Sequence, residues 1–441
     1  MEQKYIVAIE IGSSKIKGAV GAVDETGALT VLNIEEEKLI DCVRYGCIQN
    51  VEEVSNRVSR IIRLLEENNS ISPRKIKGVY VGMGGRSLSA SSREIQRQLP
   101  DELEITERII EQIKDEARAT NISERDVVDV LPRSFTIDNQ PAINPVGIFG
   151  QQINANLNLL TCKPQIKRNL NRVLGERLQL AINGYVVRPI AVADLVLSDD
   201  EKRLGCMLVD FGAETTTVSI YKDGALHYLE TIPLGSRNIT RDITSINHLE
   251  EKAEELKKAV GCANPQEQVG KKNAVDGIDV AEVNNYVQAR AGEIVANIIE
   301  QIKYAAYKPA DLPAGIVVVG GGAKLKGFNS LLEAQSAMKV RSGAPLGLIR
   351  ITDNRIQPSD SVDVISILMS AIRISAIECL EKEPSTIDET IIETPKEETK
   401  EENKEKEPKE KGSSLMDRLK SRLARIMDDE EDDDEEDDDF R

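Results

Sequence analysis

The sequence contains no tryptophan, and aromatic residues make up only 3% of its 441 residues. Few aromatic rings leave few surfaces on which nucleic-acid bases could stack, and a formal net charge of -18 repels phosphate backbones. We therefore expect no nucleic-acid partner. The chain has only two histidines, and its six cysteines form no CxxC pair, so neither a histidine-based metal site nor a paired-cysteine zinc site is predicted. Scattered cysteines are typical of buried thiols in a reducing compartment.

Long apolar runs are missing as well. No stretch approaches the roughly 20 apolar residues that cross a bilayer. The apolar run at 5–11 is followed by polar residues and not by a small-residue cleavage site. We expect a protein that is made and kept in the cytoplasm. Its length exceeds what one simple core fills, which predicts two or more domains.

Near the N-terminus, the apolar strand YIVAIEIGSS ends in an acidic residue and a glycine turn. A glycine lets the backbone approach a phosphate, the N–H groups that follow can cradle its oxygens, and a lysine can neutralise its charge. A single turn of this kind is more often an ordinary hairpin turn than a phosphate loop. The residues expected to contact phosphate here are Gly12, Ser13, Ser14 and Lys15.

A second strand–turn–strand element repeats the pattern about 200 residues later, from Asp210 to Thr216. Two such loops predict two similar domains that face one ligand. A third glycine element follows a valine-rich strand, where its backbone can lie flat against a nucleotide base or an α-phosphate. The ligand-contacting residues expected in these two elements are Asp210, Gly212, Thr215, Thr216, Gly320, Gly321 and Gly322.

Three further segments have recognisable secondary-structure patterns. The segment GYVVRPI predicts a strand over 184–190, and AVADLVLS predicts a short helix over 191–198. The segment SVDVISILMSAIRISAIECL predicts a last helix over 361–380.

In this order, the three glycine elements resemble the first phosphate loop, the second phosphate loop and the adenosine motif of the actin–DnaK–sugar kinase superfamily. Over about residues 1–382 the sequence is most similar to the FtsA family, and VVDVLPRSFTIDNQPAINPVGIFGQQINANLNLLTC is similar to that family's own inserted subdomain. The resemblance implies an α/β, actin-like (duplicated ribonuclease H-like) two-domain ATPase fold with an FtsA-type inserted subdomain, then a disordered linker and a C-terminal amphipathic helix. The expected parts are a first actin-like domain (1–85, 164–198 and 358–382), the inserted subdomain (86–163), a second actin-like domain (199–244 and 312–357), its smaller subdomain (245–311), the linker (383–412), the amphipathic helix (413–427) and an acidic tail (428–441).

The resemblance also implies ATP and magnesium as ligands. The segment KAEELKKAVGCA is similar to the family's ribose-contacting helix, which places Glu254 and Lys257 near the sugar hydroxyls. Magnesium is expected at Glu10 and Asp210, through water. Two residues depart from the family, because Glu10 replaces its usual aspartate and Glu214 its usual glycine. A carboxylate at 214 would repel a γ-phosphate unless magnesium or Lys15 compensates, so we expect at most slow hydrolysis and assign no catalytic residue.

The stretch up to Lys411 is rich in Glu, Lys, Thr and Pro and cannot bury enough surface to order itself. In the segment SSLMDRLKSRLARIM that follows, a helical period gathers the apolar residues on one face and places basic residues beside or opposite it. Such a helix could dock on the protein's own core, but the long linker and the basic face favour a membrane. The expected membrane-binding residues are Leu415, Met416, Arg418, Leu419, Lys420, Arg422, Leu423, Arg425, Ile426 and Met427.

The resemblance implies a structural protein that polymerises, tethers the tubulin-like GTPase FtsZ (the Z-ring) to the cytoplasmic face of the inner membrane at the division site, and recruits later division proteins. Its partners would be the FtsZ C-terminal tail, an anionic membrane surface and further copies of itself. Arg290 matches a contact of that acidic tail, although a plain surface arginine explains it equally well. The alternatives are a small-molecule kinase of the superfamily, for which no positioned aspartate base is found, a pilus-assembly ATPase, and a chaperone-like ATPase, which would need a further β-rich domain.

Overall fold

The computed structural model describes residues 3–246, 249–267, 274–275, 278–347 and 349–381. The predicted linker, amphipathic helix and acidic tail, including every expected membrane-binding residue from Leu415 to Met427, lie outside the described residues. Within the described part of the chain, no helix is both long enough and apolar enough to cross a bilayer.

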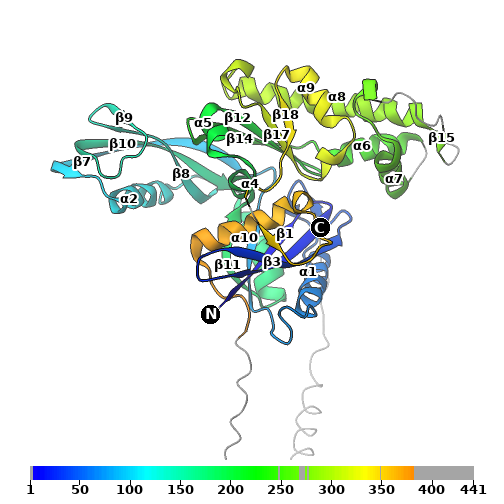
Figure 1. Ribbon diagram of the computed structural model, residues 1–441, viewed down its shortest axis with the longest axis horizontal. Helices are drawn as coiled ribbons and strands as arrows, with labels where there is room; N and C mark the ends of the chain where they lie inside the picture. The colour runs from blue at the N-terminus through cyan, green and yellow to red at the C-terminus, as the bar shows by residue number, and fades with distance from the viewer. Residues whose placement is uncertain (1–2, 247–248, 268–273, 276–277, 348, 382–441) are drawn as a thin grey trace, which may run out of the picture. The chain divides into compact units, whose positions relative to one another are not determined.

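The first large sheet contains six strands in the order β11-β6-β1-β2-β3-β19 (Figure 1). Strands β1 to β3 form an antiparallel meander, and β6 and β11 continue the sheet in parallel with β1. Every residue from Ile6 to Glu10 of β1 is buried, as befits a strand covered on both faces. The strands are β1 (Lys4–Ile11), β2 (Lys15–Val23), β3 (Leu29–Lys38), β6 (Gly78–Met83), β11 (Ala181–Val187) and β19 (Arg350–Ile351).

The second large sheet repeats this topology with five strands in the order β14-β13-β12-β17-β18. An antiparallel meander of β12, β13 and β14 is again followed by two parallel strands. The same strand order in two halves of the chain confirms the predicted actin-like duplication. The strands are β12 (Cys206–Phe211), β13 (Thr216–Lys222), β14 (Ala225–Ile232), β17 (Ile316–Val319) and β18 (Val340–Ser342).

Helices pack on both sheets. In the first half, α1 packs on β2 and β3, and α10 packs on α4, β1 and β2. In the second half, α6, α7 and α8 pack together, and α8 buries residues at three- and four-residue steps from Val280 to Ile302. The helices are α1 (Val51–Glu66), α3 (Pro164–Asn171), α4 (Arg188–Val196), α5 (Asp199–Leu204), α6 (Ser236–Ile243), α7 (Glu250–Val260), α8 (Val280–Tyr304), α9 (Phe328–Ser336) and α10 (Val362–Ser375).

Two predicted element boundaries are wrong. Helix α4 begins at Arg188, three residues before the predicted helix, because β11 ends at Val187 and Pro189 suits the first turn of a helix. Helix α10 ends at Ser375, five residues before the predicted end. The chain then lies along the first sheet. The Cys379 N–H donates to the Tyr5 carbonyl at 2.9 Å, and the Cys379 carbonyl accepts from the Lys77 N–H at 2.9 Å.

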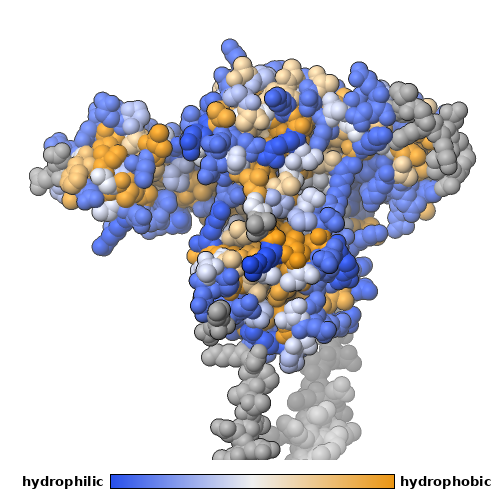
Figure 2. Space-filling model, viewed as in Figure 1, coloured by the Kyte–Doolittle hydropathy of each residue, from blue (hydrophilic) through white to orange (hydrophobic). Residues whose placement is uncertain are grey.

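A separate four-stranded sheet, in the order β7-β10-β8-β9, carries helix α2 on one face and has its own apolar core (Figure 1). It contacts β14 of the second half through Asn158, whose side-chain amide donates to the Leu226 carbonyl at 2.6 Å. Apolar residues also lie exposed on this unit (Figure 2), among them Ile143 and Phe149. Its elements are β7 (Ser89–Glu104), α2 (Glu107–Arg118), β8 (Asp126–Ile137), β9 (Gln140–Ala142) and β10 (Phe149–Cys162).

Candidate functional site

The two predicted phosphate loops have the same closing geometry. After β1, the Gly12 N–H donates to the Lys15 carbonyl at 3.0 Å. After β12, the Gly212 N–H donates to the Thr215 carbonyl at 2.9 Å. A Cβ atom at either glycine would lie within 3.0 Å of that same carbonyl oxygen, so both turns depend on glycine. The duplicated sheets therefore place two equivalent tight loops at the ends of equivalent strands.

The third glycine element joins the second loop at the end of β12, because β17 pairs in parallel with β12. Gly320 has a φ of 93°, and a Cβ atom there would lie 2.5 Å from the Phe211 carbonyl oxygen. A Cβ atom on Gly322 would lie 2.7 Å from the Phe211 ring, whereas one on Gly321 would meet nothing within 4 Å. Gly321 is thus the open position of the three, and a flat ligand can approach its backbone there.

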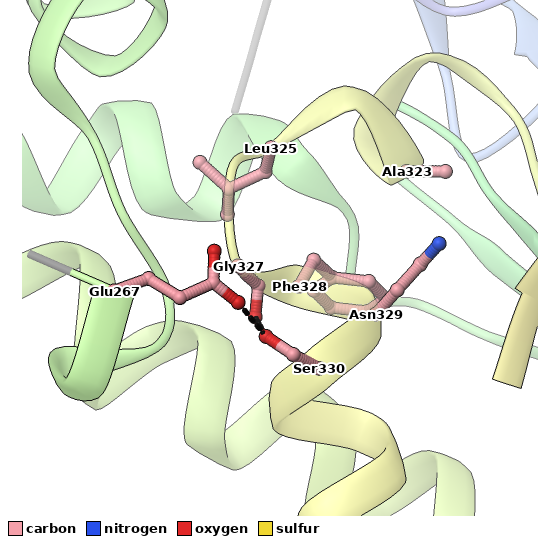
Figure 3. A pocket seen from close by; sticks show the side chains of 7 residues that line it. All are labelled: Glu267, Ala323, Leu325, Gly327, Phe328, Asn329 and Ser330. Carbon is pink, nitrogen blue, oxygen red and sulfur yellow. Dashed lines mark hydrogen bonds between the residues drawn. The ribbon is translucent and has the colours of Figure 1, made fainter. Parts of the chain in front are cut away.

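A small hollow lies beside this element, where Ser330 donates a hydrogen bond to the Glu267 carboxylate (Figure 3). Below it, the rings of Phe211 and Phe328 stack with centroids 4.4 Å apart. The hollow contains no residue of either phosphate loop. Its lining residues are Glu267, Ala323, Leu325, Gly327, Phe328, Asn329 and Ser330.

The two carboxylates predicted to hold magnesium do come together, but an arginine contacts both. Arg188 Nη1 lies 2.5 Å from Asp210 Oδ2, and Arg188 Nε lies 3.8 Å from Glu10 Oε1. Burial, with a contribution from nearby Asp363, raises the pKa of Glu10 to about 7, although Arg188 and Lys17 act in the opposite direction. Nowhere in the described ranges do three or more His, Cys, Asp or Glu side chains form a group that could hold a metal ion. Pairing with Arg188 is an arrangement that does not fit carboxylates open to a hydrated magnesium ion, as predicted for Glu10 and Asp210.

Sequence reasoning missed Arg188, since it places this residue inside a strand. One feature of the sequence could have indicated its role, namely an arginine at the start of a helix. The positive end of the helix dipole disfavours a cation there unless carboxylates are nearby. Lys17 was also missed, because its partners lie more than 340 residues away in the sequence. Its buried ammonium group lies 2.7 Å from Asp363 and donates to the Asp360 carbonyl at 2.5 Å.

Glu214 is almost fully buried, and its charge is compensated in a way that the sequence did not predict. Its carboxylate accepts from the Tyr45 N–H at 2.8 Å and pairs with Arg237 at 3.1 Å. Arg241 lies 3.4 Å from the same oxygen. In this structure the compensating cations are therefore Arg237 and Arg241. Lys15 turns instead to Glu36, 2.7 Å away at the surface.

The two predicted ribose contacts lie on α7, beside the segment that follows the second loop. Lys257 Nζ is 2.6 Å from the Glu254 carboxylate and donates to the Thr240 hydroxyl at 2.8 Å. Burial lowers the pKa of Lys257, with Glu254 acting against it. Burial alone would raise the pKa of Glu254, but attraction to Lys257 and hydrogen bonds lower it overall. Helix α6 connects this pair to the loop, because the Ser236 N–H donates to the Gly212 carbonyl at 3.0 Å.

The remaining predicted residues differ in what they offer a ligand. Ser13 and Thr215 are buried in their loops, whereas Ser14 is exposed. Thr216 faces the interior, and its hydroxyl donates to the Leu234 carbonyl at 2.8 Å.

Arg290, the predicted FtsZ contact, lies on α8 and forms a two-pronged ion pair with Asp242 of α6, at 2.6 and 3.1 Å. It also pairs with Glu293. The hydrogen bonds that Arg290 donates to Asp242 raise the pKa of Arg290. Its side chain thus joins two helices, and its role towards a partner stays a prediction.

Comparisons with known proteins agree with this architecture. The family described as "Cell division protein FtsA" matches residues 207–362, and the family described as "SHS2 domain inserted in FTSA" matches residues 85–161. A similar solved structure is the PilM-PilN type IV pilus biogenesis complex, with a TM-score of 0.59 and 15% identity over 83% of this chain and 98% of that one, which shows the shared fold alone.

Curated relatives span most of the chain. The cell division protein FtsA of Escherichia coli K12 is 27% identical over 383 residues, which are 82% of this chain and 89% of that protein. FtsA of Porphyromonas gingivalis W83 is 32% identical over 335 residues, which are 74% of this chain and 69% of that protein. This chain therefore belongs to the FtsA family of cell division proteins.

Proposed function

We propose that this chain binds ATP between its two phosphate loops, polymerises, and tethers FtsZ to the cytoplasmic face of the inner membrane at the division site, where it recruits later division proteins. The observation that carries the nucleotide part is the duplicated loop closure at Gly12 and Gly212 with the open backbone of Gly321 beside it. Exposed backbone N–H groups in such loops are suited to phosphate oxygens.

Cationic side chains near the loops supply charge for the triphosphate. Lys15 is held by one exposed ion pair with Glu36, which contributes little and can be exchanged for a phosphate contact. Arg237 reaches the first loop, where it donates to the Ser13 carbonyl at 3.3 Å. Magnesium at Glu10 and Asp210 forms no part of this proposal, because both carboxylates contact Arg188. With no free carboxylate there to position an attacking water, we expect at most slow hydrolysis.

Membership of the FtsA family supports the tethering role. The segment at 413–427, which would form the membrane contact, lies outside the described residues, so its support is the sequence pattern alone. Four basic residues and one aspartate between Leu415 and Met427 favour an anionic lipid surface, at about 1 kcal/mol for each basic residue near it.

The inserted subdomain is the proposed site of polymerisation. Within this subdomain, Ile143 is fully exposed and Phe149 is 59% exposed. A group of exposed apolar residues favours contact with another protein surface, and this subdomain exposes Leu103, Ile143, Val146, Ile148 and Phe149. A contact between different faces of successive copies does not close, and so generates a filament.

Co-sedimentation with anionic vesicles, with FtsZ and ATP present, tests the tethering role. Leu419→Glu with Ile426→Glu places two charges on the apolar face and is expected to leave both this protein and FtsZ in the supernatant. Ser414→Glu with Ser421→Glu adds the same charge on the opposite face of the helix and serves as the matched control. The control is expected to retain most of the binding. If the apolar-face variant sediments as the control does, membrane attachment through this segment is wrong.

A further inference from the structure

We propose that the Arg188 guanidinium takes the place of the divalent cation in this site, so that ATP binds without a metal ion. The proposal rests on the ATP binding proposed above and specifies the electrostatics of the same site.

The first support is the contact geometry. Arg188 is in contact with Asp210 at 2.5 Å and with Glu10 at 3.8 Å, and all three side chains are less than one-fifth exposed. Asp210 accepts a hydrogen bond from the guanidinium and Glu10 forms a longer ion pair with it, so both carboxylates are less available to order the water shell of a hydrated ion. A divalent cation brought to the same carboxylates would also be repelled by the fixed positive charge.

The second support is that the fold makes room for this side chain. Arg188 is the first residue of α4, directly after β11, and its guanidinium lies against the backbone that follows β6. A Cβ atom on Gly84 would lie 3.3 Å from Arg188 Nε. The absence of a side chain at Gly84 therefore allows the close approach, and the guanidinium is held in place from three elements.

The third support is the charge balance around Glu10. Three carboxylates, those of Glu10, Asp210 and Asp363, face two cations, Arg188 and Lys17. Lys17 pairs with Asp363, 2.7 Å away. Within the described part of the chain, Arg188 is the cation whose ion pairs reach both Glu10 and Asp210.

This arrangement has a chemical consequence. A guanidinium offers N–H donors and one fixed positive charge to phosphate oxygens, but it cannot accept a proton at neutral pH. Unlike a bound metal ion, it does not hold a water molecule whose pKa it lowers. The site is then suited to holding ATP and poorly suited to splitting it.

Titration of the full chain with a fluorescent ATP analogue, once in magnesium and once in EDTA, tests the proposal. We expect the two affinities to agree within about threefold, far less than a charge-assisted contact contributes. Binding in magnesium alone would leave the proposed ATP binding intact and overturn the role of Arg188. If the chain binds ATP in neither buffer, both the proposed ATP binding and the role of Arg188 are overturned.

Three variants locate the effect. Arg188→Gln is expected to lose about tenfold or more in EDTA affinity, the equivalent of one lost charged hydrogen bond. Magnesium is expected to restore part of this loss, because Glu10 and Asp210 are then free of the arginine. Arg188→Lys keeps the charge and is expected to remain indifferent to magnesium. The control is Arg203→Gln. Arg203 is exposed and precedes the first residue of β12, at the end of the strand away from Asp210, so this variant is expected to match the wild type.

A second readout does not involve nucleotide. Thermal unfolding of Arg188→Gln with and without Mn²⁺ is expected to show stabilisation by the ion, whereas the wild type is expected to show none. Equal stabilisation of both proteins would overturn the proposal, because the wild-type carboxylates would then be available to a metal.

Discussion

The Glu214 carboxylate accepts a hydrogen bond from the backbone N–H of Tyr45 at 2.8 Å, across 169 residues of chain. The same carboxylate pairs with Arg237, which in turn donates to the Ser13 carbonyl. Glu214 thus links the second phosphate loop to the first half of the molecule, with Arg237 as the bridge between the two loops. A residue that looks unfavourable for a phosphate site has become part of the contact between the two halves.

Glu214→Gln is expected to lower the free energy of unfolding by about 1–3 kcal/mol, because Arg237 loses its most buried partner while the bond from Tyr45 can persist. Urea denaturation measures the change. Glu250→Gln is the control, since Glu250 pairs with Arg237 at 3.4 Å but is 44% exposed. Its effect is expected to stay within about 1 kcal/mol. Equal effects of the two variants would show that burial of Glu214 does not matter.

The glycine run at the end of β17 offers two alanine variants with opposite expectations. Gly322→Ala puts a methyl group 2.7 Å from the Phe211 ring, which stacks on Phe328, and is expected to cost about 1–3 kcal/mol through overpacking. Gly321→Ala meets no atom within 4 Å and is expected to leave the free energy of unfolding unchanged. Thermal or urea unfolding of the two variants measures the difference. Equal destabilisation would contradict the close packing of Gly322 on Phe211 and the open space at Gly321.

The proposed contact of Arg290 with the acidic FtsZ tail can be separated from its role between α6 and α8. Asp242→Asn weakens the ion pair that engages Arg290 and is expected to increase affinity for an FtsZ tail peptide. Arg290→Gln removes the cation and is expected to decrease it. Fluorescence anisotropy with a labelled peptide measures both. If the two variants change the affinity in the same direction, Arg290 acts through the fold and does not contact the peptide.

His227 makes the contact between β14 and the inserted subdomain sensitive to acid. Its Nδ1 lies 3.1 Å from Arg133 and 2.6 Å from the Tyr307 hydroxyl. Burial, helped by Arg133 and opposed by Asp223 and by a hydrogen bond with the Lys222 backbone, lowers the pKa of His227 below its ordinary value of 6.5. Because the folded state binds this proton less tightly than the unfolded state does, stability is present above about pH 6.5 and falls as the pH drops below it. The melting temperature of His227→Gln is expected to fall less than that of the wild type between pH 7.5 and pH 5.5, whereas parallel falls would contradict this role.

The three glycine elements could be placed from the sequence because each depends on a local signal, an apolar strand followed by glycine. The duplication followed from the repeat of that signal and from family resemblance. Contacts between side chains could not be placed in this way. Arg188 is separated from Asp210 by 22 residues, and its place at the start of a helix does not indicate which carboxylates it pairs with. Lys15 lies at a motif position, yet its ammonium group pairs with Glu36 at the surface.

Calorimetric titration of the full chain with ATP, beside the same titration of Gly321→Glu and Gly321→Ala, tests the proposed ATP binding most directly. A side chain at position 321 projects into open space, so both variants are expected to unfold at the wild-type temperature. The account predicts that the wild type and Gly321→Ala bind ATP and that Gly321→Glu does not, because its carboxylate occupies the space beside the loops. Absence of binding by the wild type, or undiminished binding by a folded Gly321→Glu variant, would contradict it.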